Sequence, residues 1–365
     1  MSGPKKRGKQ NYVGVLSSVF AIVIGLLVGL VILVICNPAQ ALPGFVTILN
    51  GALTHGLKGV GQVFYYATPI ILTGLSVGFA FKTGLFNIGT PGQFIVGAFA
   101  AVYVGIMWDG LGSVHWAVAL LAAVLGGALW GLVPGLLKAY FNVNEVIASI
   151  MMNYIGMYLV NWIVKSYKPI FNNMRNESKN VAVTAQIPKM GMDKLFPESS
   201  VNGGILIAIA TVILIWVILN KTTFGYELKA VGFNRDASKY AGINEKKSII
   251  MSMVIAGAIA GMAGGILYLA GTGKHIEIKD VLASEGFTGI SVALLGLSHP
   301  IGVLFSGIFI AYLTAGGFYL QLFEFSTEII DIIVAVIIYF SAFALIVKTI
   351  LTRVNKNREK GGGQS

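Results

Sequence analysis

The chain of 365 residues is 56% hydrophobic and only 11% charged, with a formal net charge of +11. Soluble globular domains carry roughly 25% charged residues, so this composition excludes an ordinary soluble domain and indicates that apolar surface faces lipid. The basic residues lie between the apolar runs and not on one amphipathic face, so we expect membrane lipid around the chain and no nucleic-acid partner.

Apolar runs free of charge predict an all-α integral membrane protein with about ten transmembrane helices. A helix needs roughly 20 apolar residues to cross a bilayer core. The first run is longer than the roughly 7–15 apolar residues of a signal peptide, so we expect an uncleaved helix. The predicted spans are 13–35, 63–81, 86–107, 115–137, 146–164, 204–220, 249–270, 286–297, 301–320 and 328–347.

Two apolar stretches do not fit a simple crossing. The stretch 44–62 is rich in glycine and carries His55 and Lys58, so we interpret it as an interfacial or re-entrant segment. The run 286–297 is short and is followed by Ser298-His299-Pro300. It is therefore either a full span or a half-helix.

The distribution of basic residues predicts the topology. If ten spans start from an inner N-terminus, the inner segments hold 17 of the 26 lysines and arginines, as the positive-inside rule requires. The membrane domain is then 13–350, between cytoplasmic ends at 1–12 and 351–365. The segment 165–203 becomes an extracellular loop, and 221–248 a cytoplasmic one.

A weak internal similarity indicates an inverted repeat. The segments 91–102 and 285–296 share a pattern of glycine followed by small and apolar residues. In the predicted topology the first starts inside and the second outside, which is typical of inverted-topology repeats.

Polar and helix-breaking residues mark a possible solute path. Gly84, Gly89, Pro91 and Gly92 predict a broken helix at the entry to the third span, and such breaks occur where protein or a water-filled cavity satisfies the backbone. Three amides could bond a polar solute or the freed backbone groups, and the structural role is the commoner one for each alone. These are Asn87, Gln93 and Asn153.

The cytoplasmic segment 223–243 predicts a short helix outside the membrane. Asn234 can cap a helix, Asp236 suits its positive end, and Gly242 suits the left-handed residue that ends one. The predicted helix, about 235–241, is too short to be stable alone. It either docks on a partner or is a plain helical turn between two spans.

Signatures of catalysis are missing from the sequence. Gly271-Thr-Gly-Lys274 lacks the first glycine and the final serine or threonine of a phosphate-binding loop. The four histidines lack metal-site spacing, and no nucleophile, base and acid trio is visible. We therefore expect no enzyme activity, no metal and no cofactor.

Four segments together resemble the permeases of ATP-binding-cassette importers of the branched-chain amino acid, ribose and nucleoside type. The nucleoside permeases are the most similar among these. The resemblance is carried by 72–93, by 144–154, by 225–232 with 240–243, and by 286–296.

The resemblance implies a bacterial cytoplasmic membrane protein that forms the path for a nucleoside. It implies ATPase subunits, a second permease subunit that is a paralogue, and an extracellular solute-binding lipoprotein. It also implies that the segment 225–243 rests in a groove of the ATPase. The residues expected to couple the two are Glu227, Gly232, Asn234, Arg235, Asp236, Tyr240 and Gly242.

Other functions remain open at this point. The same fold serves permeases for ribose-like sugars and branched-chain amino acids, although a zwitterion would favour charged partners along the path. A secondary transporter would work without ATPase partners. A membrane enzyme or scaffold would need reactive side chains deep in the spans, and none stands out.

Overall fold

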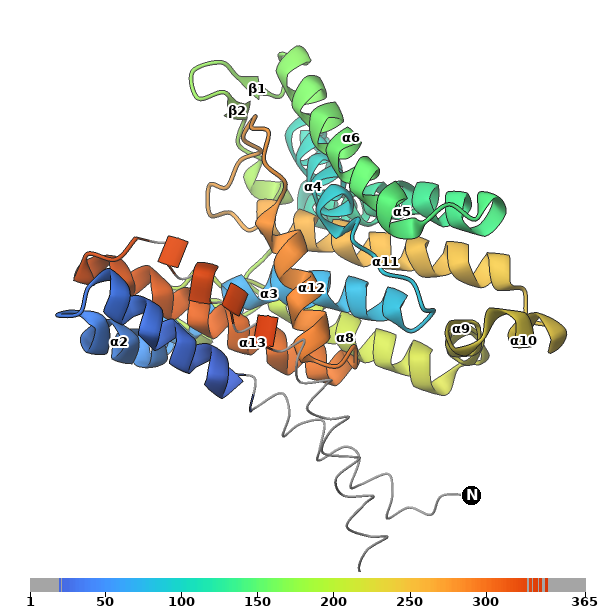
Figure 1. Ribbon diagram of the computed structural model, residues 1–365. Coiled ribbons are helices and arrows are strands. Elements are labelled where there is room, and N and C mark those ends of the chain that lie inside the picture. Colours follow the sequence, from blue (N-terminus) through green and yellow to red (C-terminus); the bar gives the residue numbers. More distant parts are fainter. Residues whose placement is uncertain are drawn as a thin grey trace, which may run out of the picture.

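The computed structural model describes residues 20, 22–326, 328–329, 331–333, 335–336 and 339–340. Seven helices in this part of the chain are long and apolar enough to cross a membrane, and they form the bundle in Figure 1. They are α3 (Gly56–Phe81), α4 (Thr90–Met107), α5 (His115–Phe141), α6 (Glu145–Ser166), α8 (Gly204–Lys221), α11 (Glu245–Tyr268) and α13 (Pro300–Gly317). Short 3₁₀ segments extend α5 and α13, namely η1 (Asp109–Val114) and η3 (Phe318–Phe323).

Seven of the ten predicted spans coincide with these helices, so a multi-pass all-α membrane protein is confirmed. The predicted first span contains the helix Ile22–Cys36, and its beginning lies outside the described residues. Most of the predicted last span, together with both predicted cytoplasmic ends, also lies outside them.

Two apolar helices are too short to cross a membrane alone. They are α2 (Ala41–Thr54), with 14 residues, and α12 (Ser284–Leu295), with 12. At 1.5 Å per residue they are about 21 and 18 Å long, against a hydrocarbon core of roughly 30 Å. The stretch 44–62 is helical except at a turn by His55. The short length of α12 fits a half-helix and not a full span across the membrane.

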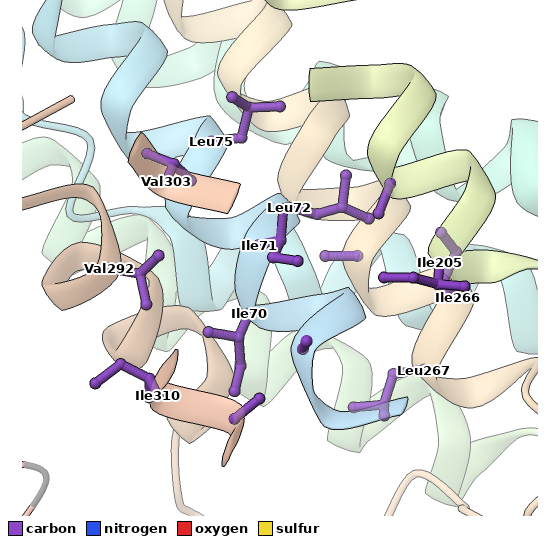
Figure 2. Packing of buried hydrophobic residues seen from close by; sticks show 14 of the residues in the cluster. Ile70, Ile71, Leu72, Leu75, Ile205, Ile266, Leu267, Val292, Val303 and Ile310 are labelled. Carbon is purple, nitrogen blue, oxygen red and sulfur yellow. The ribbon is translucent and has the colours of Figure 1, made fainter. Parts of the chain in front are cut away.

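Helix α3 lies at the centre of the core. In an apolar stretch of 18 residues within this helix, 83% of the residues are buried. The helix contacts α8, α11, α12 and α13. Figure 2 shows Ile71 and Leu72 of α3 among aliphatic side chains of these neighbours, including Ile266 of α11 and Val292 of α12. The enclosed position also suits the polar residues of α3 that are buried away from lipid. They are Thr68, Thr73 and Ser76.

Glycines allow α5 and α11 to pack backbone against backbone. A Cβ atom added to Gly257 would lie 2.3 Å from the carbonyl oxygen of Gly127, and one added to Gly261 would lie 2.3 Å from that of Ala123. Small residues at helix contacts are typical of membrane bundles, where packing replaces the hydrophobic effect between helices.

The segment predicted as an outer loop, 165–203, folds onto the ends of α4 and α11. Its backbone donates from Ala182 to Gly105 and from Ile187 to Leu269. The antiparallel strands β1 (Phe171–Asn172) and β2 (Glu177–Ser178) make a hairpin, and β2 also bridges to Glu277. Two short helical turns follow, η2 (Val183–Ala185) and α7 (Met192–Leu195).

Candidate functional site

Two helices connect α8 to α11 at one end of the bundle, α9 (Thr223–Phe233) and α10 (Arg235–Tyr240) (Figure 1). The predicted short helix is confirmed as α10. The Asn234 side chain accepts a hydrogen bond from the Ala237 amide at 2.9 Å, and Asp236 lies in the first turn. Gly242 has φ +80°, and its amide bonds to the Lys239 carbonyl, so both predicted end signals act as expected.

Helix α9 was not predicted, and it changes the interpretation of Gly232. This glycine lies within helix α9 and not in a loop before α10. A Cβ atom at Gly232 would lie 2.4 Å from the Lys82 carbonyl oxygen and 3.0 Å from the Gly84 amide nitrogen. Gly232 therefore lets α9 rest directly on the turn that follows α3.

Arg235 holds α10 onto the bundle. Its Nε and Nη2 atoms donate to Glu245 of α11 at 2.7 and 3.3 Å, and its Nη1 donates to the Asn142 side chain after α5 at 3.3 Å. A bidentate pair of this kind fixes geometry as well as adding energy. Arg235 is thus occupied within the chain and positions α10.

An open groove runs between α9 and α10, which we call the inner groove. Its volume is about 560 Å³. The groove is lined by Thr223, Tyr226, Glu227, Ala230, Phe233, Asn234, Ala237, Ser238, Ala241 and Ile243. At its edge Phe233 is 90% exposed, and the nearby Tyr240 is 95% exposed. Exposed aromatic side chains beside a groove indicate a protein contact.

The three predicted path amides lie together at the break between α3 and α4, but they are buried. Asn87 is 0% exposed, and Gln93 and Asn153 are each 1% exposed. Asn87 Nδ2 donates to Gln93 Oε1 at 2.8 Å, and Gln93 Nε2 donates back to Asn87 Oδ1 at 3.1 Å. The pair is thus largely satisfied by itself.

Asn153 of α6 caps helix α4 from outside. The N-cap position of α4 is Gly89, which offers no side chain. Asn153 Oδ1 accepts from the Gly92 amide at 2.9 Å, and its Nδ2 donates to the Ile88 carbonyl at 2.9 Å. It thereby satisfies backbone groups that a helix start leaves unpaired. In this arrangement the amides hold the break in place.

The turn after α3 joins the break to α9 and α11. Thr83 donates to Ser252 of α11 at 2.9 Å, and Gly232 of α9 packs on the Lys82 and Gly84 backbone. The turn is therefore in backbone contact with α9 and in a buried hydrogen bond with α11.

Basic groups gather near the same turn. Burial and the neighbouring ammonium of Lys229 lower the pKa of Lys82. Burial and Lys82 lower the pKa of His299, which precedes α13. This cluster fits a cytoplasmic position.

A second cavity lies near the Tyr268 end of α11, away from α10, and was missed from the sequence. We call it the outer cavity, after its side in the predicted topology. Its volume is about 220 Å³. It is lined by Ile95, Met157, Asn161, Tyr268, Lys274, His275, Glu277, Lys279, Val281, Leu282, Ala283, Ser284 and Glu285. Nothing in the sequence indicates that Glu285 meets Lys274, to which it is ion-paired at 2.9 Å. Among the described residues, no group of three or more His, Cys, Asp or Glu side chains could hold a metal ion.

Comparisons with known proteins match the chain to transport permeases. Residues 59–342 match the family described as "Branched-chain amino acid transport system / permease component". The chain is 37% identical to the guanosine ABC transporter permease protein NupP of Bacillus subtilis, over 92% of this chain and 95% of that protein. It is 33% identical to the nucleoside ABC transporter permease protein NupB of Lactococcus lactis, over 93% of each.

A sugar permease is also similar. The glucose ABC transporter permease protein TsgB13 of Haloferax volcanii is 31% identical over 77% of this chain and 75% of that protein. No solved structure matches the chain.

Proposed function

The chain belongs to the permease component family of the branched-chain amino acid transport system type, and we propose that it is the membrane-spanning subunit of an ATP-binding-cassette importer for a nucleoside. The similarity to two nucleoside permeases over more than nine tenths of the chain carries this proposal. The permease is not itself an enzyme, because separate ATPase subunits hydrolyse the ATP.

The inner groove is proposed as the contact with the ATPase. Its supporting observations are the exposed side chains of Phe233 and Tyr240 and the tight contact of Gly232 with the turn after α3. Glu227 and Asp236 add charge to the same unit. Asn234, Arg235 and Gly242 are proposed to keep α10 in shape, so that the ATPase meets a preformed surface.

A second permease subunit is proposed to pack against α6. This helix exposes Tyr154, Tyr158 and Trp162, and both tyrosines lie at least eight residues from either end of the helix. A tyrosine hydroxyl at that depth needs a partner, which lipid tails do not provide. Helix α8, by contrast, exposes Leu206, Ile209 and other aliphatic side chains to lipid.

The inverted repeat is retained as a proposal. The two predicted repeat segments, 91–102 and 285–296, are in contact at their first residues, which supports the proposal. A Cβ atom at Gly286 would lie 2.6 Å from the Pro91 Cα. Helix α4 and the half-helix α12 thus begin side by side within the bundle, as half-helices do at transporter binding sites.

The proposed topology places 1–12, the α9–α10 unit and 351–365 in the cytoplasm, around a permease domain at 13–350, with 165–203 outside. Cys36 is the single cysteine, so a Cys36→Ser background gives clean labelling. In intact cells an impermeant maleimide is expected to label Lys194→Cys and to spare Lys239→Cys until the membrane is opened. Labelling of Lys239→Cys from outside would overturn this topology.

Uptake tests the solute. Loss of the chain is expected to abolish import of labelled guanosine or uridine. Expressing the chain again is expected to restore this import only when the ATPase subunits and the solute-binding lipoprotein are also present. The relative TsgB13 makes a sugar the second candidate. If loss of the chain spared nucleoside uptake and abolished that of glucose, ribose or leucine, the nucleoside assignment would be wrong. Uptake without any ATPase would indicate a secondary transporter.

A further inference from the structure

In the proposed topology the outer cavity lies on the outer side of the bundle, between α6, the segment after α11 and the start of α12. Near its rim, Asn161 of α6 donates to the Lys279 carbonyl at 3.0 Å. Its floor is at Glu285, next to Gly286, which packs on Pro91 at the start of α4. The neighbouring Gly92 bonds to Asn153, the ninth of the 22 residues of α6. The floor is therefore linked through the start of α4 to the middle of α6.

An ion pair stands at this floor. Lys274 Nζ lies 2.9 Å from Glu285 Oε1, and the two side chains are 39% and 23% exposed. The Lys274 ammonium also lies 5.9 Å from the ring centre of Tyr268. Charged groups are costly inside a membrane and mark substrate or ion pathways there.

The charges that line the outer cavity cancel. Glu285 balances Lys274, and Glu277 balances Lys279 at 2.9 Å. His275 also lines the outer cavity, and its Nδ1 is buried without a hydrogen-bond partner among the described residues. A wall that is neutral overall, yet rich in donors and acceptors, suits a solute without net charge better than an anion.

We propose that the outer cavity binds the ribose of a nucleoside, with its hydroxyls donating to the Glu285 carboxylate and accepting from the Lys274 ammonium. This inference rests on the proposed function and names the site where the solute first meets the permease. Sites that enclose a drug-sized ligand measure roughly 300–1,000 Å³. The outer cavity, at about 220 Å³, admits a sugar and leaves the base at its mouth.

Direct binding tests the proposal without the solute-binding lipoprotein. The full chain in lipid nanodiscs is titrated with uridine and with 2′,3′-dideoxyuridine by ligand-observed NMR. The dideoxy compound should bind about tenfold more weakly, because it leaves a charged partner without its hydrogen bond. Glu285→Gln and Lys274→Met should each weaken uridine binding by about tenfold and remove the difference between the two ligands.

A second ion pair on the same face provides the matched control. Lys58 and Glu198 lie 3.3 Å apart, with side chains 57% and 79% exposed, and neither lines the outer cavity. Lys58→Met and Glu198→Gln should bind both ligands like the parent chain. If Glu285→Gln does not assemble, Lys274→Met carries the test with the same expectation.

The outcomes separate this inference from the proposed function. If nucleoside uptake depends on the chain but the ligand preference persists in both ion-pair variants, the outer cavity does not bind the ribose. If the parent chain binds the two nucleosides equally, the inference also fails. If uptake shows that the solute is not a nucleoside, the proposed function fails first, and this inference fails with it.

Discussion

Replacing Gly232 by leucine is expected to leave the protein in the membrane but to uncouple ATP hydrolysis from solute uptake. A Cβ atom at this position would lie 2.4 Å from the Lys82 carbonyl oxygen, and backbone cannot move aside as a side chain can. Overpacking of this kind costs about 1–3 kcal/mol. That free energy shifts the equilibrium away from the coupled arrangement by roughly 5- to 150-fold. The measurement is solute-stimulated ATPase activity and uptake in reconstituted vesicles.

Two further variants show whether the effect belongs to the α9 contact. Gly242→Val should reduce coupling less, because Gly242 has φ +80° but no atom within 4 Å of an added Cβ, so only backbone strain is introduced. Lys246→Ala should be mild, because Lys246 lies over the Tyr140 ring at 4.9 Å, away from α9. Full coupled activity in an assembled Gly232→Leu protein would remove α9 from the coupling route.

Helix α10 could be predicted because its signals are local. Asn234 and Gly242 act within a few residues of themselves, and no distant contact is needed to interpret them. Helix α9 was missed for the opposite reason. Gly225 and Gly232 suggest breaks in a sequence, yet both are required by close packing, one against the Ile218 carbonyl and the other against Lys82.

The path candidates show the same limit. A sequence shows that amides at a helix break or deep in a span need partners, and Asn87, Gln93 and Asn153 were selected on those grounds. It does not show that Asn153 pairs with a backbone amide 61 positions away. The outer cavity could not be predicted from the sequence for a related reason. Lys274 and Glu285 belong to separate segments, and each residue alone suggests only a charged end of a span.

The largest effect on stability is expected at Asn153, because it bonds both sides of the break. Asn153→Ala leaves the Gly92 amide and the Ile88 carbonyl without their partner. An unsatisfied buried polar group costs about 1–3 kcal/mol, although hydrogen bonds in membrane proteins average nearer 0.6 kcal/mol in double-mutant cycles. We expect a loss of about 2 kcal/mol for the two groups together, which lies between twice the membrane-protein average, about 1.2 kcal/mol, and the upper limit for two unsatisfied groups, about 6 kcal/mol. Thermal unfolding in detergent measures it.

Substitutions at Asn87 and Gln93 test whether these amides stabilise the break between α3 and α4 or contact the solute. A double-mutant cycle with alanine at both positions should give a coupling free energy of about 1 kcal/mol, because the two amides bond mainly to each other and only Asn87 has a further partner, Ser76 at 3.2 Å. Asn220→Ala is the matched control, since its exposed amide bonds only within its own helix, to the Trp216 carbonyl. It should change stability by less than about 0.5 kcal/mol. If Asn153→Ala and the cycle leave stability unchanged while uptake falls sharply, these amides contact the solute instead, and the break is held by the packing of α3, α6 and α12 alone.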